Sequence, residues 1–201
     1  MLPQIDPNYE PHATLEQSVT NFLTALNFHV FSRGTYHEAM PPELVETLQH
    51  RDTPTALYLR GRADRIAVHR ARPIEFEFEC KTHANPKLHD MTIEALPLAH
   101  HIVKSRIDVK CLYCYRDPYR GLDFGFWTDT APTVDRIFVP NRWQGIMLQF
   151  FDRILQDTFP GVLILHPARP MGGSGDPFII VKEYNVNQLA SWQELIDAII
   201  H

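Results

Sequence analysis

The stretch IEFEFECKT, residues 74–82, decides the fold because its apolar and charged side chains alternate with a period of two. Such alternation predicts a β-strand with one apolar face and one face that carries acids and Lys81. A second β-rich run, residues 56–69, precedes it, and the short segment 70–73 separates the two. We therefore expect an antiparallel hairpin.

The register of this hairpin follows from its turn. If the chain reverses at Ala71 and Arg72, the numbers of paired residues sum to 143, which sets Asp64 opposite Glu79 and Arg62 opposite Lys81. Directly opposed residues on one face have Cβ atoms about 4.5–5.5 Å apart. Two carboxylates that close repel each other unless a cation lies between them, so the register predicts a divalent cation site.

Lys81 belongs to the same patch as Glu79, because residues two apart on a strand share a face. Mg²⁺ prefers oxygen ligands and keeps several waters. One of these waters can be activated while the metal polarises a phosphoryl oxygen. The ammonium of Lys81 can orient the water or stabilise the charge that develops on the phosphorus oxygens. Together these groups are the minimum needed to hydrolyse a phosphodiester.

The same residues carry a resemblance to a known family. Asp64, followed fifteen positions later by Glu79-Cys80-Lys81, resembles the D…(D/E)-x-K signature of the PD-(D/E)xK nuclease superfamily. The strings GRADRI (61–66) and ECKT (79–82) are similar to those of RecB-like nucleases, and the resemblance covers about residues 14–117. It implies a restriction-endonuclease-like αβββαβ core and Mg²⁺-dependent DNA cleavage, with Mn²⁺ as a substitute. Asp64 and Glu79 would be metal ligands and Lys81 the catalytic lysine.

Two features depart from this pattern. RecB-like members usually carry Gln-x-x-x-Tyr on the helix after the lysine strand, and residues 90–104 contain neither Gln nor Tyr. Members with an iron–sulfur cluster need four cysteines, and this chain has three. A Holliday-junction resolvase, a restriction enzyme and a mobile-element endonuclease all remain open.

Four more residues are candidates for the site. Glu16 lies at the edge of the apolar face of a predicted first helix, where many superfamily members place an acid, and we expect it as a further metal ligand. The alternative is that its carboxylate only interacts favourably with the dipole of that helix, near the helix N-terminus. Glu77 is a candidate outer carboxylate. Arg62 and Arg65 flank Asp64 and are expected to contact DNA phosphates, whereas the arginines at 70 and 72 fit a solvated hairpin tip.

Cysteine and histidine patterns point to the core rather than to chemistry. Cys111 and Cys114 lie three apart on a predicted strand, so they face opposite sides and are expected to be buried, unligated thiols. His100 and His101 are expected to be packed or exposed, while His83 continues the face of Glu79 and Lys81.

The remaining elements predict an α/β protein with a mixed central sheet flanked by helices, in one domain spanning residues 1–201. Residues 118–201 are expected to complete the sheet and the substrate groove. The predicted helices cover Thr14 to about Asn27 from a capping box, 41–49, 86–104 with a kink at Pro97, 144–159, and a stretch after Ser191. The predicted strands cover 29–34, 109–115, 122–127, 162–165 and 178–181, the last two around a glycine-rich hairpin turn.

Composition limits the surroundings and the partners. The 201 residues carry 19 Lys+Arg against 24 Asp+Glu, a net charge of −5, which argues against purely electrostatic coating of nucleic acid. No apolar run approaches the roughly 20 residues of a spanning helix, and the start of the chain lacks the features of a signal peptide. We expect no membrane partner, a cytoplasmic location, and DNA as partner. A homodimer is one option that the sequence leaves open.

Three functions compete at this stage. The first is a metal-dependent deoxyribonuclease. The second is a catalytically inactive DNA- or protein-binding subunit of the same fold, whose hairpin charges are remnants. The third is a metal-dependent hydrolase of another phosphoester. Cleavage of DNA that depends on Mg²⁺ or Mn²⁺ separates the first from the second, and a preference for polymers over mononucleotides separates it from the third.

Overall fold

A mixed five-stranded sheet forms the base of the computed structural model, which describes residues 11–32, 53, 56–57, 61–82, 91–117, 119–168, 176–181 and 190–201. In spatial order its strands are β1 (Phe28–Ser32), β2 (Arg65–His69), β3 (Glu75–Thr82), β5 (Cys111–Asp117) and β6 (Leu122–Trp127). The pair β3–β5 is parallel and the other neighbours are antiparallel. The predicted α/β class with a mixed sheet is confirmed.

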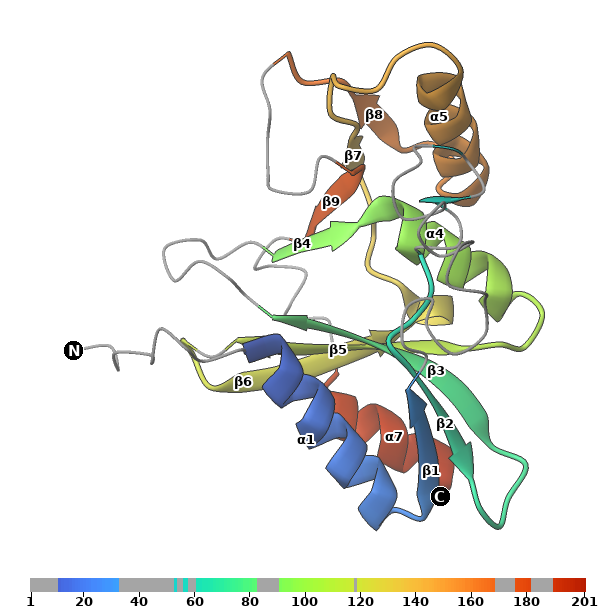
Figure 1. Cartoon of the computed structure of the whole chain (residues 1–201), viewed down its shortest axis with the longest axis vertical. Helices are drawn as coiled ribbons and strands as arrows, with labels where there is room; N and C mark the ends of the chain where they lie inside the picture. Colours follow the sequence, from blue (N-terminus) through green and yellow to red (C-terminus); the bar gives the residue numbers. More distant parts are fainter. Residues whose placement is uncertain are drawn as a thin grey trace, which may run out of the picture.

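A second, smaller sheet lies above the first in Figure 1. Its strands, in order, are β4 (Met91–Glu94), β9 (Phe178–Val181), β7 (Arg136–Phe138) and β8 (Leu163–Leu165). Residues beyond 117 therefore do more than complete the central sheet. They supply β6 to it and also build three of the four strands of the second sheet, which the sequence did not predict.

Helices cover both faces of the first sheet. Helices α1 (Pro11–Ala25) and α7 (Trp192–Ile200) lie on one face, where α1 packs on β1 and β3 and α7 on β5 and β6 (Figure 1). Helices α4 (Ala95–Ser105) and α5 (Ile146–Thr158) pack against each other on the opposite side, and a short 3₁₀ turn, η1 (Thr128–Thr130), contacts α4. The order α1-β1-β2-β3-α4-β5 matches the expected αβββαβ core, with β4 inserted before α4.

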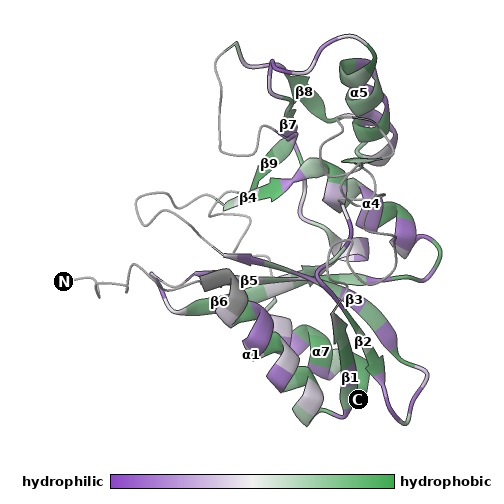
Figure 2. Cartoon of the chain, viewed as in Figure 1, coloured by the Kyte–Doolittle hydropathy of each residue, from purple (hydrophilic) through white to green (hydrophobic). Residues whose placement is uncertain are grey.

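The alternation in β3 determines which side chains reach which face. Phe78 and Cys80 are buried in the apolar cluster beneath α1 and α7, together with Trp192. On the neighbouring strand β5, Tyr113 and Tyr115 point to the other face of the sheet and pack in the apolar cluster on the α4 side. Burying each large apolar side chain contributes about 1.5–3 kcal/mol, so both faces are firmly anchored. The acids of β3 consequently face α4. Figure 2 shows hydrophobic and hydrophilic residues along the strands of this sheet.

Helix termini follow local chemistry. Helix α1 begins at Pro11, three residues before the predicted capping box at Thr14, because the fixed φ of proline suits a first helical position. It ends where predicted, and Asn27 leaves it with a positive φ of 68°. The second predicted capping box is present: the hydroxyl of Ser191 accepts a hydrogen bond of 3.2 Å from the backbone N–H of Glu194.

Two predicted runs were assigned too broadly. Within the predicted strand 56–69, Ala56 and Leu57 are helical, and Gly61 N–H donates to the carbonyl of Leu57 at 3.1 Å. Within the predicted helix 86–104, residues 91–94 form β4, and Pro97 lies in the first turn of α4, where its missing N–H costs no intrahelical bond. Short apolar runs fit both structures, and distant partners decide between them.

Strands β8 and β9 do not pair with each other as a hairpin would require, because β7 lies between them in the second sheet. The glycine-rich segment predicted to be the turn, 170–175, lies outside the described residues. The predicted helix 41–49 and His83 fall outside the described residues. In the part of the chain that the structure describes, no helix is long and apolar enough to cross a membrane.

Candidate active site

The β2–β3 hairpin has the register that the sequence predicts. Arg65 pairs with Phe78 and Ile66 with Glu77, so that paired numbers sum to 143. Asp64 precedes β2 by one residue, and its Oδ2 accepts a hydrogen bond of 2.8 Å from the backbone N–H of Cys80. Asp64 is therefore held at β3 beside Glu79.

Glu79 is a buried carboxylate with an unusual balance of contacts. Its side chain is 7% exposed, and its Oε1 lies 2.7 Å from the Nζ of Lys81. Its Oε2 is buried and has no hydrogen-bond partner among the described residues. Burial raises the pKa of Glu79 to about 7, Lys81 opposes the rise, and the charges of Asp64 and Glu94 add to it.

Lys81 is held between two carboxylates. Its Nζ lies 2.7 Å from Glu79 Oε1 and 2.8 Å from Oε2 of Glu94, the last residue of β4. Burial alone would lower the pKa of Lys81, but the charges of Glu79 and Glu94 raise it above its usual value. The lysine is therefore a permanent cation and hydrogen-bond donor in this site.

Glu94 is the residue that the sequence reading missed. The sequence predicts a helix over 86–104, whereas Glu94 is the last residue of strand β4. One signal was available, because an acid directly before Ala95 and Pro97 is typical of a helix start. That signal locates the boundary of α4 but does not reveal that Glu94 meets Lys81.

A pocket of about 220 Å³ opens over these charges. Arg62, Glu79, Lys81 and Glu94 line it, with Asp176 at its edge. Asp176 also lies 3.5 Å from Arg142. Arg62 thus faces the same space as the acids, in line with the predicted position opposite Lys81.

Arg65 and Glu16 lie on the other side of the sheet. Arg65 pairs with Phe78, whose side chain packs beneath α1, and a guanidinium nitrogen of Arg65 lies 2.6 Å from Glu16 Oε2. A second guanidinium nitrogen donates to the carbonyl of Asp64 at 3.3 Å. The structure thus joins Glu16 to Arg65, on the α1 side. Their roles in binding metal and DNA stay predictions.

Glu77 faces α4 but is joined to another partner. Its Oε2 forms an ion pair with Lys104 in the last turn of α4. The side chain of Glu77 is 5% exposed and that of Lys104 is 17% exposed, so this pair ties β3 to α4 at the edge of the core. The predicted core thiols are also found: Cys111 and Cys114 are buried, free, and belong to the apolar clusters on opposite faces.

The site suits a hard divalent cation with few protein ligands. In the residues that the structure describes, no group of three or more His, Cys, Asp or Glu side chains could hold a metal ion. Mg²⁺, however, is typically bound through one or two carboxylates and retains its waters. The buried Oε2 of Glu79, which has no hydrogen-bond partner in the part of the chain that the structure describes, and the nearby carboxylate of Asp64 fit that requirement.

Comparisons with known proteins give similarity to solved structures. No family model matches the chain, and no curated protein matches it. A solved structure of a Holliday junction resolvase from Archaeoglobus fulgidus, an archaeal hyperthermophile, aligns with 92% of this chain and 93% of its own length, with a TM-score of 0.44 and 9% identity.

Proposed function

We propose that this protein is a metal-dependent deoxyribonuclease that hydrolyses DNA phosphodiester bonds. The observation that carries the proposal is Glu79, a buried carboxylate that lines an open pocket beside Asp64. One of its oxygens lies on Lys81, and the other has no hydrogen-bond partner among the described residues. A purely structural acid would be expected to have its buried oxygens satisfied. The choice of DNA among phosphoesters rests on the signature around Asp64 and Glu79-Cys80-Lys81.

Each charged group has a role that its position permits. Asp64 and Glu79 would hold Mg²⁺, which supplies an activated water and polarises the scissile phosphate. Lys81, kept protonated by two acids, donates hydrogen bonds to the attacking water or to the oxygens where negative charge develops. Glu94 fixes the direction of the Lys81 ammonium, so it is a positioning residue. Arg62 binds a neighbouring phosphate from the wall of the pocket.

The test is a cleavage assay on linear, circular, single-stranded and branched DNA, with Mg²⁺, with Mn²⁺ and with chelator. We expect cleavage of at least one substrate in either metal and none in chelator. Mononucleotides and simple phosphoesters should be poor substrates. A wild-type protein that binds DNA and cleaves none of it would favour the inactive binding subunit instead.

A matched pair of variants separates the site from the strand that carries it. Glu79→Gln keeps shape and burial but removes the charge, and we expect it to abolish cleavage. Glu77→Gln makes the same change two residues away on the same face, where the partner is Lys104. It should retain cleavage within a few-fold at a temperature where it is folded. An equal loss of cleavage in both variants would contradict the assignment of Glu79 to the active site.

A further inference from the structure

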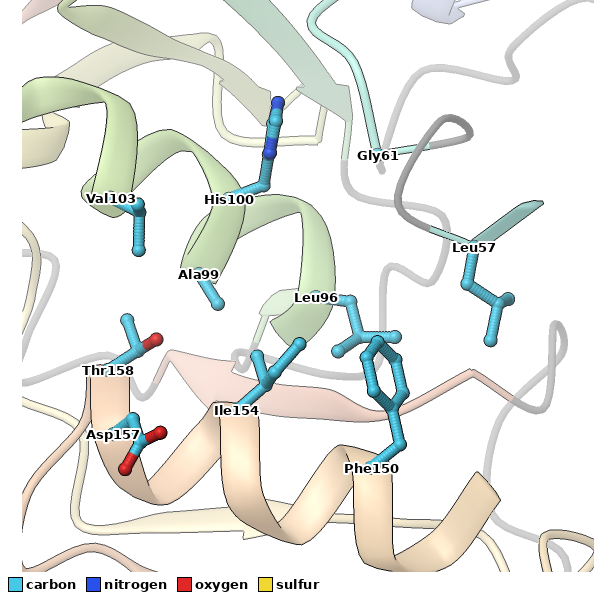
Figure 3. A pocket seen from close by; sticks show the side chains of 10 residues that line it. All are labelled: Leu57, Gly61, Leu96, Ala99, His100, Val103, Phe150, Ile154, Asp157 and Thr158. Carbon is cyan, nitrogen blue, oxygen red and sulfur yellow. The ribbon is translucent and has the colours of Figure 1, made fainter. Parts of the chain in front are cut away.

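A second pocket, of about 270 Å³, lies between α4 and α5 beside the charged one (Figure 3). Its apolar wall is formed by Leu57, Leu96, Ala99, Val103, Phe150 and Ile154. Its polar groups come from His100, Asp157 and Thr158. Figure 3 places Phe150 near Leu96 at one end of the α5 wall and Asp157 beside Thr158 at the other.

The two pockets adjoin. Leu57, Gly61 and Leu96 line both of them. A single ligand can therefore extend a charged group toward Arg62 and Lys81 while an apolar group enters between α4 and α5. A nucleotide has this division, because its phosphate is anionic and its base is flat and largely apolar on both faces.

Within the part of the chain that the structure describes, the apolar pocket is open. Val103, which lines it, is 47% exposed. Exposed apolar surface is unfavourable in water by roughly 25 cal/mol per Å², and an open pocket of this kind is typical of a binding site. A base entering it would contact Leu96, Ile154 and the ring of Phe150.

We propose that this pocket receives one unpaired DNA base adjacent to the phosphodiester in the charged pocket. The inference rests on the proposed nuclease function and deepens it by naming the substrate class. In an intact duplex every base is stacked and paired, so a base reaches such a pocket only from a bulge, a branch point, a single strand or a flipped position. The preferred substrate is therefore DNA with an unpaired base next to the cleaved bond.

The polar end of the pocket adds selectivity among bases. The carboxylate of Asp157 accepts hydrogen bonds and has none to donate, so it pairs with exocyclic amino groups such as those of cytosine and adenine. Guanine also carries an amino group, whereas thymine offers only its ring N3–H. The pocket therefore favours a base with an amino group, such as adenine or cytosine, over a thymine at the unpaired position.

The experiment measures binding of a fluorescent DNA hairpin that carries a single-nucleotide bulge, with either adenine or an abasic site at the bulge. Ca²⁺ replaces Mg²⁺, since it offers similar oxygen-ligand chemistry with looser geometry. We expect wild-type protein to bind the adenine bulge about tenfold more tightly than the abasic bulge, the size of one base-stacking contact. Equal affinity for the two would overturn the proposal.

Variants assign the effect to the pocket. Val103→Phe adds bulk at the exposed rim and should bring the two affinities together. The matched control is Ile107→Phe, which adds the same kind of bulk at a 73% exposed position outside the pocket and should leave the difference intact. Phe150→Ala is a second variant that removes a wall instead of filling the space. If Val103→Phe weakens both probes equally, the pocket is not a base site.

Base selectivity and cleavage complete the test. Replacing adenine by thymine in the bulge should weaken binding a few-fold, and Asp157→Asn should remove that difference. Base-dependent binding without any Mg²⁺-dependent cleavage would refute the nuclease while supporting the pocket. Efficient cleavage with no preference for an unpaired base would refute the pocket alone.

Discussion

Glu77 and Glu79 lie two residues apart on β3, face the same side of the sheet and are almost equally buried, at 4% and 6% exposure. Their surroundings differ. Glu77 forms an ion pair with the ammonium of Lys104 from α4, so one carboxylate is matched by one cation. Glu79 shares Lys81 with Glu94, has Asp64 nearby, and keeps one oxygen without a partner among the described residues.

The difference distinguishes a structural ion pair from a site prepared for a ligand. Around Glu77 the acid and base neutralise each other, so the pair can remain dry in the core. Around Glu79 two carboxylates, those of Glu79 and Glu94, share Lys81, and Asp64 lies nearby. Burial raises the pKa of Glu79, and the negative charges of Asp64 and Glu94 add to the rise. An added cation would offset these negative charges.

The largest effect should come from removing Lys81. Lys81→Ala takes away the donor that would stabilise charge in the transition state, and we expect kcat to fall by about 10³-fold or more. The matched change on the neighbouring pair, Lys104→Ala, should leave kcat within a few-fold in the folded protein. Steady-state cleavage kinetics on the best DNA substrate measure kcat for both variants. Comparable losses would erase the functional distinction between the pairs.

For the free energy of unfolding we expect the reverse, with a larger loss at the Glu77–Lys104 pair than at Glu79. Glu77→Ala leaves the Lys104 ammonium without its described partner in the core, and we expect a loss of about 3–5 kcal/mol in the free energy of unfolding. Glu79→Gln removes a repelling charge and should cost little at neutral pH. Urea unfolding at pH 7 without divalent metal compares the two variants. A larger loss for Glu79→Gln would mean that Glu79 is the structural acid.

The pH dependence should sharpen the same contrast. The pKa of Glu79 rises from 4.5 to about 7 in the folded state, so folding favours its protonated form. The resulting penalty is absent below pH 4.5, grows between 4.5 and 7, and is complete above 7. Glu79→Gln should therefore gain stability over wild type as the pH rises, up to about 3 kcal/mol at pH 8. Parallel stability curves from pH 4 to 8 would contradict this.

Asp64 has both a structural hydrogen bond and a predicted role in binding metal, so different variants are needed to test the two. Asp64→Ala removes the acceptor of the Cys80 N–H and should lower stability by about 1–3 kcal/mol. Asp64→Asn keeps an acceptor oxygen and should be nearly as stable as wild type without metal. Thermal unfolding with and without Mn²⁺ is the measurement: wild type should gain stability in metal, and Asp64→Asn should lose most of that gain. An unchanged metal response would remove Asp64 from the site.

The smallest effect is expected on the opposite face. Glu16 and Arg65 are partly exposed, at 18% and 26% of their side chains, and pairs of this kind contribute about 0–1 kcal/mol. Glu16→Gln should shift the unfolding midpoint little. Its effect on cleavage tests the predicted metal role directly, since a change of less than two-fold would leave the contact with Arg65 as its main function.

Local pattern was enough to predict the hairpin. The alternation of β3 and the position of the turn gave the observed pairing of Arg65 with Phe78, and with it the nearness of Asp64 to Glu79. The same alternation indicates that Arg65 and Asp64 face opposite sides of the sheet, because adjacent strand residues do so. What Arg65 shares with Arg62 is only its position near Asp64 in the sequence.

Contacts between distant segments were not predictable in this way. Glu94 reaches Lys81 because β4 pairs with β9, more than 80 residues later in the chain, and nothing local to residues 91–94 indicates that partner. The Glu77–Lys104 pair likewise depends on how α4 crosses the sheet. Short apolar runs such as 56–57 and 91–94 acquire their secondary structure from such packing.

The pairing of β4 with β9 also has a consequence for the newly made chain on the ribosome. Asp64, Glu79 and Lys81 are synthesised early, but among the described strands only β9 pairs with β4, which carries Glu94. A nascent chain that ends before residue 181 therefore lacks the strand that holds Glu94 against Lys81. The charged site can take its final form only after residue 181 has been synthesised, so a translation product truncated before that residue should hold the motif without the arrangement described here.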